Sequence, residues 1–149
     1  EKGIFKFIKM FKEIDFPSTL SIVGNSEKNK NKEKNINYFG YVSESKLLIS
    51  IYDEHNITVL PSFTEATPYV VDESLSRKRP VIIFEDIEYI VREKVGIFVS
   101  KRDISSFSKT TKYIMDNYQE IQKKMEKNDL PTKKSMIKQI SDIINSKSW

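Results

Sequence analysis

The chain has 149 residues, no cysteine, a single histidine (His55) and a net charge of +4. The missing cysteines exclude disulfides and thiolate metal sites, and the single histidine excludes a histidine-based triad or a multi-histidine metal site. No apolar run reaches the roughly 18 residues of a membrane span, and the length suits one domain.

The first half of the chain alternates helical and extended patterns. Residues 4–14 predict a helix with one apolar stripe of Ile4, Phe7, Ile8, Phe11 and Ile14. Short apolar runs predict strands at 19–24 and 36–42, and the polar segment 25–35 between them predicts a solvated loop. Ser43 is a candidate N-cap for the next helix, whose predicted inward face consists of Leu47, Leu48, Ile51 and Tyr52.

The second half continues this alternation. A strand is predicted over 57–63 and is ended by Pro61, because proline cannot continue a central ladder. A helix follows at about 67–78, with Pro68 suited to its first turn. The run 80–85 is apolar throughout and predicts a buried strand, which precedes a short helical turn at 86–92 and a last strand at 96–100.

Residues 103–149 are predicted to form C-terminal helices. The first has apolar residues at helical spacing, namely Ile104, Phe107, Thr111, Ile114, Tyr118, Ile121 and Met125, and the second follows Pro131. Residues 108–149 hold nine lysines against five acidic residues. Such a tail lacks the dense basic face of a nucleic-acid-binding protein, so we expect no nucleic-acid partner. Two alternatives remain, a solvated helix face and a peripheral contact with an anionic membrane.

Strands that alternate with helices of this length predict βαβ crossovers and a parallel sheet with helices on both faces. The predicted fold class is therefore α/β and Rossmann-like, in a single domain over residues 1–149. Ligands of such sheets lie outside the carboxyl ends of the strands, beside the first turn of the next helix.

Two segments qualify as ligand sites, "GYVSES" (40–45) and "PSFTEATPYVVDE" (61–73), and the second is unusually rich in small and polar residues. The start of the following helix offers free backbone N–H groups that suit a phosphate. Glu65 precedes this helix, and Glu73 lies inside it, where its carboxylate could accept hydrogen bonds from a diol. Two interpretations follow from these residues: a phosphate-and-diol site, or an exposed helix glutamate preceded by an acid that favours the helix dipole.

A family resemblance favours the first interpretation. "EATPYVVDE" (65–73) resembles the E-x7-E signature of retaining, family 4-like glycosyltransferases with the GT-B fold. Five further segments resemble the family in collinear order over about residues 2–100: "EKGIFKFIKMFKEI", "TLSIVGN", "INYFGYVSESKLLISIY", "ITVLPSFTE" and "RPVIIF". These enzymes have two Rossmann-like domains, and the chain resembles the C-terminal, donor-binding one.

The resemblance implies a role for each matching residue. Glu65 is implied to be catalytic, near the donor sugar's hydroxyls and anomeric centre, and Glu73 to hold the ribose. Lys2 is implied to neutralise the diphosphate. The remaining implied donor-binding residues line the base, the phosphates and the sugar; they are Tyr41, Val42, Ala66, Thr67 and Pro68.

The resemblance also implies a context for the domain. A nucleoside-diphosphate sugar is the implied donor, and a glycan or lipid-linked acceptor would bind mainly to an N-terminal domain outside this chain. No metal or cofactor is implied, and we expect the isolated chain to be inactive. The Lys-, Asn- and Ile-rich composition indicates an AT-rich bacterial genome, and we therefore expect a role in surface polysaccharide synthesis. The expected location is the cytoplasm, with peripheral contact at the inner face of the plasma membrane as an option.

Three positions depart from the family pattern. Ala66 stands where glycine is usual, Arg79 replaces a frequent glycine, and "FEDIEYIV" (84–91) lacks paired glycines. Family contacts that need close backbone approach at Ala66 are therefore not assumed, and contacts from the loop at 84–91 cannot be carried over. The alternative function is a non-catalytic nucleotide-binding or interaction module of the same fold.

Overall fold

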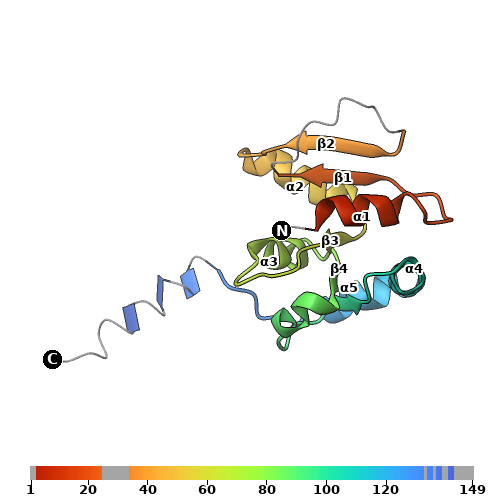
Figure 1. The fold of residues 1–149 in the computed structure, drawn as a ribbon. Helices are drawn as coiled ribbons and strands as arrows, with labels where there is room; N and C mark the ends of the chain where they lie inside the picture. Colours follow the sequence, from red (N-terminus) through yellow and green to blue (C-terminus); the bar gives the residue numbers. More distant parts are fainter. Residues whose placement is uncertain (1–2, 25–33, 133, 136, 139–140, 143–149) are drawn as a thin grey trace.

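The computed structural model describes residues 3–24, 34–132, 134–135, 137–138 and 141–142. Its elements follow the order α1 (Ile4–Phe11), β1 (Leu20–Val23), β2 (Ile36–Gly40), α2 (Ser45–Glu54), β3 (Thr58–Leu60), α3 (Tyr69–Ser76), β4 (Val81–Phe84), the 3-10 helix η1 (Glu85–Ile90), β5 (Ile97–Ser100), α4 (Ile104–Asp116) and α5 (Tyr118–Met125). The predicted α/β, Rossmann-like class is confirmed, because parallel strands alternate with helices that pack on them (Figure 1).

The strands form two parallel sheets, where the sequence predicts one. β1 pairs with β2, and β3, β4 and β5 form a second sheet with β4 in its centre. β3 has only three residues because it ends before Pro61, which has no N–H to donate to a ladder. Within the described residues, no ladder joins β1 to β3.

The hydrophobic core surrounds β4 and α1. All four residues of β4 are completely buried, as their continuous apolar run predicts. The Phe7 ring of α1 packs against Phe84 of β4 and Phe107 of α4, with centroid separations of 6.2 and 5.3 Å. The apolar stripe of α1 therefore anchors this helix to the second sheet.

Several predicted boundaries are wrong for identifiable reasons. α1 ends at Phe11, because Glu13 and Ile14 donate their backbone N–H groups to carbonyls three residues back, which tightens the last turn. The residue before α2 is Glu44 and not Ser43. Of the predicted inward face, Ile51 and Tyr52 are buried, whereas Leu47 is 40% exposed.

The helix predicted between Ile104 and Met125 is two helices. The chain leaves helical geometry at Asn117, whose side-chain amide donates to the Tyr113 carbonyl at 2.8 Å. Asparagine offers the backbone this alternative hydrogen bond and so favours helix ends. α4 and α5 therefore meet at a break that the apolar spacing alone does not reveal.

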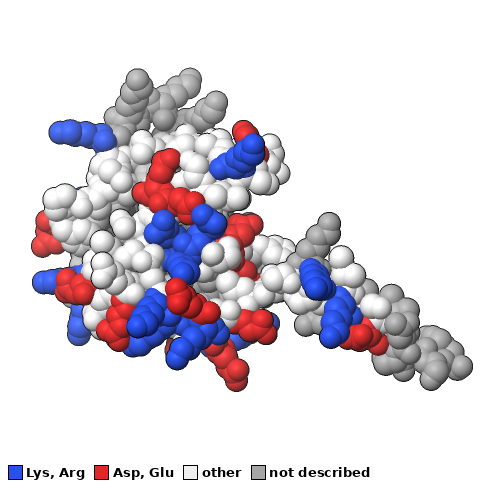
Figure 2. All heavy atoms as spheres, turned by 180° about the vertical axis from the view of Figure 1, so that it is seen from behind, with Lys and Arg blue, Asp and Glu red and all other residues white. Residues whose placement is uncertain are grey.

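The loop predicted over 25–35 and the helix predicted after Pro131 fall largely outside the described residues. In Figure 1 the described chain beyond α5 runs away from the body. Among the described helices, none is both long enough and apolar enough to cross a bilayer. On the face in Figure 2, basic and acidic side chains are interspersed over the body, without one continuous basic patch.

Candidate functional site

The loop between β3 and α3 carries Glu65. Ser62 is completely buried, and its hydroxyl donates to the Glu65 Oε1 at 2.6 Å. Tyr89 of η1 holds the backbone of the same residue, because its hydroxyl accepts from the Glu65 N–H at 2.9 Å and donates to the Glu65 carbonyl at 2.6 Å. Both the carboxylate and the backbone of Glu65 are therefore held in place.

Arg102, just after β5, binds the backbone of this loop. Its guanidinium donates to the Pro61 carbonyl at 2.8 Å and to the Ser62 carbonyl at 2.9 Å, and it pairs with Asp86 at 2.6 Å. The side chain is only 7% exposed and lies 4.1 and 4.3 Å from the ring centroids of Phe63 and Phe84. A planar guanidinium suits this position, because it can stack on rings while it donates several hydrogen bonds.

The start of α1 touches the same loop at Gly3. This residue has a φ of 67°, and a Cβ there would come within 1.9 Å of the Pro61 carbonyl oxygen. Only glycine combines a left-handed backbone with so close an approach. Lys2, its predicted diphosphate-binding neighbour, lies outside the described residues, so its role remains a prediction.

Glu73 is an exposed residue of α3 whose carboxylate contacts α2. The Tyr52 hydroxyl donates to the Glu73 Oε2 at 2.9 Å, although Tyr52 itself is only 9% exposed. Burial, followed by the negative charge of Glu73 and this hydrogen bond, raises the pKa of Tyr52 far above its ordinary value. Tyr52 therefore keeps its proton and acts as a donor.

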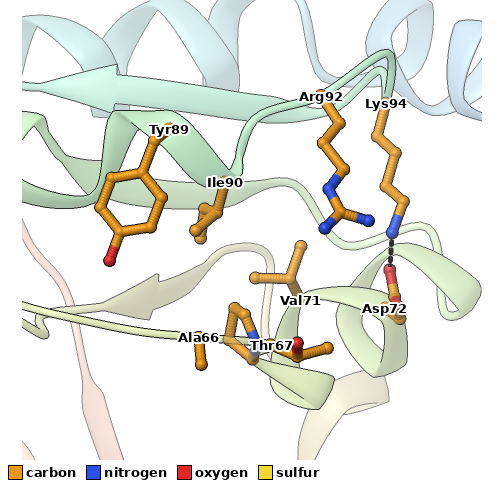
Figure 3. Close-up of a pocket in the computed structure, with 9 residues that line it drawn as sticks. Ala66, Thr67, Val71, Asp72, Tyr89, Ile90, Arg92 and Lys94 are labelled. Carbon is orange, nitrogen blue, oxygen red and sulfur yellow. Dashed lines mark hydrogen bonds and ion pairs between the residues drawn. The ribbon is translucent and has the colours of Figure 1, made fainter.

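A shallow pocket lies on another face of α3. The predicted residues Ala66, Thr67 and Pro68 form one wall together with Val71 and Asp72 of α3, and Tyr89, Ile90, Arg92 and Lys94 lie across from them (Figure 3). Its volume is about 90 Å³, which is small beside the roughly 300–1,000 Å³ of typical ligand pockets.

Positive charge faces the first turn of α3 across this pocket. Lys94 pairs with Asp72, whereas Arg92 points into the pocket and has no ion-pair partner among the described residues (Figure 3). The backbone N–H groups at a helix start and a nearby guanidinium both favour a negatively charged group. The loop, the helix start and Arg92 can therefore bind an anion, while Glu65 and Glu73 can accept hydrogen bonds.

Tyr41 and Val42 lie apart from these contacts. They follow the end of β2, and Tyr41 is 79% exposed, with no hydrogen bond from its hydroxyl to any described residue. Val42 is half-buried. Neither residue lines the pocket, so their predicted contact with a base remains a prediction.

Sequence reasoning missed several residues of this region, among them Tyr52, Ser62, Tyr89, Arg92 and Arg102. Tyr52 was predicted to be inward-facing, but the spacing carried no sign that its hydroxyl meets Glu73. The only sequence feature that pointed to Ser62 was its place as a small polar residue directly after Pro61. Arg102 has contacts about 40 residues away in sequence, and no local pattern indicates them.

Residues 1–117 match the model of the family described as glycosyl transferases group 1. The matched range includes Glu65, Glu73 and the loop between β3 and α3. No curated protein matches the chain significantly.

Solved structures show the same fold at low identity. A sucrose-phosphate synthase from Thermosynechococcus elongatus has a TM-score of 0.75 at 15% identity, over 97% of this chain and 42% of that one. HepE from Anabaena, in complex with UDP, has a TM-score of 0.73 at 14% identity, over 97% of this chain and 45% of that one. The structure of HepE in complex with UDP and glucose gives the same TM-score, identity and coverage. The chain spans less than half the length of these proteins.

Proposed function

The chain belongs to the group 1 family of glycosyl transferases, and from this membership we propose that it binds the nucleotide-sugar donor of a retaining glycosyl transfer. The observation that carries the proposal is the position of Glu65 and Glu73 around the start of α3, within the matched range. HepE, which has a similar fold, forms complexes with UDP and with UDP and glucose. This supports a nucleoside diphosphate as the ligand class.

The donor would lie across the loop between β3 and α3. Its diphosphate would approach the first turn of α3, where free N–H groups and the helix dipole favour negative charge. Lys2 would add a positive charge, and stabilising the leaving diphosphate in this way lowers the barrier to breaking the glycosidic bond. In this proposal these groups, and not a metal ion, supply the positive charge.

The two carboxylates would have different roles. Glu73 would accept hydrogen bonds from the ribose hydroxyls, while Tyr41 and Val42 would line the base. Glu65 would lie near the sugar, where its carboxylate is already oriented by Ser62 at 2.6 Å. Groups held before the substrate arrives lose little freedom when it binds.

The acceptor would bind mainly outside the residues that hold the donor. We propose a glycan or lipid-linked glycan, bound mainly by a second domain, because the chain matches less than half of each solved relative. Bacterial surface polysaccharide synthesis is the proposed setting. The isolated 149-residue chain is expected to bind donor without transferring sugar.

Titration calorimetry against UDP, GDP and ADP tests the proposal. One nucleotide should bind, and Glu73→Ala and Lys2→Ala should each weaken it by about tenfold, as expected for the loss of one charged hydrogen bond. Lys124→Ala is the control, because it also removes one positive charge, but Lys124 lies on α5, pairs with Glu120 and has no contact with the proposed site. The proposal fails if none of the three nucleotides binds, or if both variants bind as well as the wild type.

A further inference from the structure

We propose that Tyr52 is a positioning residue that orients the Glu73 carboxylate toward the vicinal hydroxyls of a bound nucleotide. This inference rests on the proposed function, because it assigns a ribose to Glu73. Tyr52 lies on α2, outside the loop and helix start that carry the other predicted residues.

The first argument is that only one of the two Glu73 carboxylate oxygens is bonded within the protein. The Tyr52 hydroxyl donates to the Glu73 Oε2 at 2.9 Å. The Oε1 has no hydrogen-bond partner among the described residues, and Glu73 is exposed. A carboxylate accepts about four hydrogen bonds. One is therefore used by the protein, and the remaining acceptor positions are available to a ligand in a fixed direction.

The second argument is that Tyr52 is itself fixed. Arg79, which follows α3, donates to the Tyr52 carbonyl at 3.1 Å and to the Asp53 carbonyl at 2.9 Å. Arg77, the residue directly after α3, donates to both oxygens of the Asp53 carboxylate. The end of α3 thus holds the end of α2, and α2 in turn holds the Glu73 side chain of α3.

The third argument is the chemical state of the phenol. The raised pKa of Tyr52 keeps the hydroxyl protonated, so it donates to Glu73 at every physiological pH. A free glutamate side chain samples many rotamers, and a bound ligand must restrict them. A permanent donor on Oε2 removes much of this cost before the ligand arrives.

The experiment compares ribonucleotide and 2′-deoxyribonucleotide binding to the 149-residue chain. The probe is whichever of UDP, GDP and ADP binds most tightly, paired with its 2′-deoxy form. The wild type should prefer the ribonucleotide by about tenfold, because a site built to bind a hydroxyl rejects the analogue that lacks it. Tyr52→Phe should reduce this preference to about twofold, with little change in affinity for the deoxy form.

Two further variants separate orientation from loosened structure. Tyr118→Phe removes a phenol that accepts from Arg79 at 3.1 Å and donates to the Asn56 carbonyl at 2.9 Å, but that does not contact Glu73. This variant should keep the wild-type preference. In a Glu73→Ala background the preference should be absent, and adding Tyr52→Phe should then change nothing. Thermal unfolding confirms that each variant is folded.

The possible results are distinguishable. If Tyr52→Phe keeps the wild-type preference, the inference is overturned and the proposed function stands. A nucleotide that binds the wild type with no ribose preference also overturns the inference, together with the assignment of Glu73. If no nucleotide binds at all, the proposed function and the inference fall together.

Discussion

The two glutamates are held in different ways, and the difference is instructive. Around Glu65 the backbone is held as well as the carboxylate, because Arg102 binds the Pro61 and Ser62 carbonyls, Tyr89 binds the backbone of Glu65, and Ser62 donates to its carboxylate. Around Glu73 the backbone is an ordinary helix, and Tyr52 fixes only the side chain. A loop needs buried support for its shape, whereas a helix needs support only for the direction of one carboxylate.

This contrast predicts the largest loss of stability at Arg102. Arg102→Ala leaves two loop carbonyls without donors and Asp86 without its partner, so the free energy of unfolding should fall by about 4 kcal/mol. Urea denaturation measures the change. Arg92→Ala is the control, because Arg92 has no ion-pair partner among the described residues, and it should cost at most about 0.5 kcal/mol. Equal losses in the two variants would contradict the comparison.

A substitution at Gly3 should also destabilise the loop between β3 and α3. Gly3→Ala combines a strained left-handed backbone with a Cβ 1.9 Å from the Pro61 carbonyl oxygen, so it should cost roughly 3 kcal/mol of unfolding free energy. Gly40→Ala is a matched control, because Gly40 has a φ of 69° but open space around its Cβ. It should cost about 1 kcal/mol. If both variants lose the same stability, the contact between α1 and the loop is unimportant.

Ser62→Ala should have a smaller effect. The substitution removes one buried hydroxyl that donates to Glu65 at 2.6 Å and should lower the free energy of unfolding by about 1 kcal/mol. Ser76→Ala, which removes an exposed hydroxyl bonded to the Glu73 carbonyl, should be close to neutral. Urea denaturation of the two variants side by side gives the difference, and a neutral Ser62→Ala would show that the Glu65 carboxylate does not depend on this donor.

The smallest effect concerns the surface pair between α2 and α3. The hydrogen bond from Arg77 holds the pKa of Asp53 below its usual value. The stability from this pair is therefore complete above the usual carboxyl pKa and disappears as the pH falls through the lowered value. Asp53→Asn should lower the Tm slightly at neutral pH and leave it unchanged near about pH 2. An equal Tm difference at both pH values would assign the effect to something other than this charge.

The strands were predictable because each is a short apolar run with a clear end. β4 is buried throughout as its composition predicts, and β3 stops before Pro61. The resemblance to a GT-B glycosyltransferase is also confirmed at the level of the family. Local patterns of this kind depend on residues close together in sequence.

Features that depend on distant contacts were not predictable. The break at Asn117 interrupts an apolar stripe that continues on both sides of it. The apolar spacing predicts that the Tyr52 ring faces inward, but it does not indicate which residue the hydroxyl contacts. Arg102 has the sequence context of any surface cation, yet its side chain is 7% exposed.

Arg102 also has a consequence for the order of assembly during synthesis. The loop at 61–68 is translated about 40 residues before the guanidinium that binds the Pro61 and Ser62 carbonyls. A nascent chain grows by about 5–20 residues per second. The two carbonyls are therefore synthesised several seconds before the guanidinium that binds them. The loop that holds Glu65 therefore cannot gain this support until the residues after β5 have been synthesised.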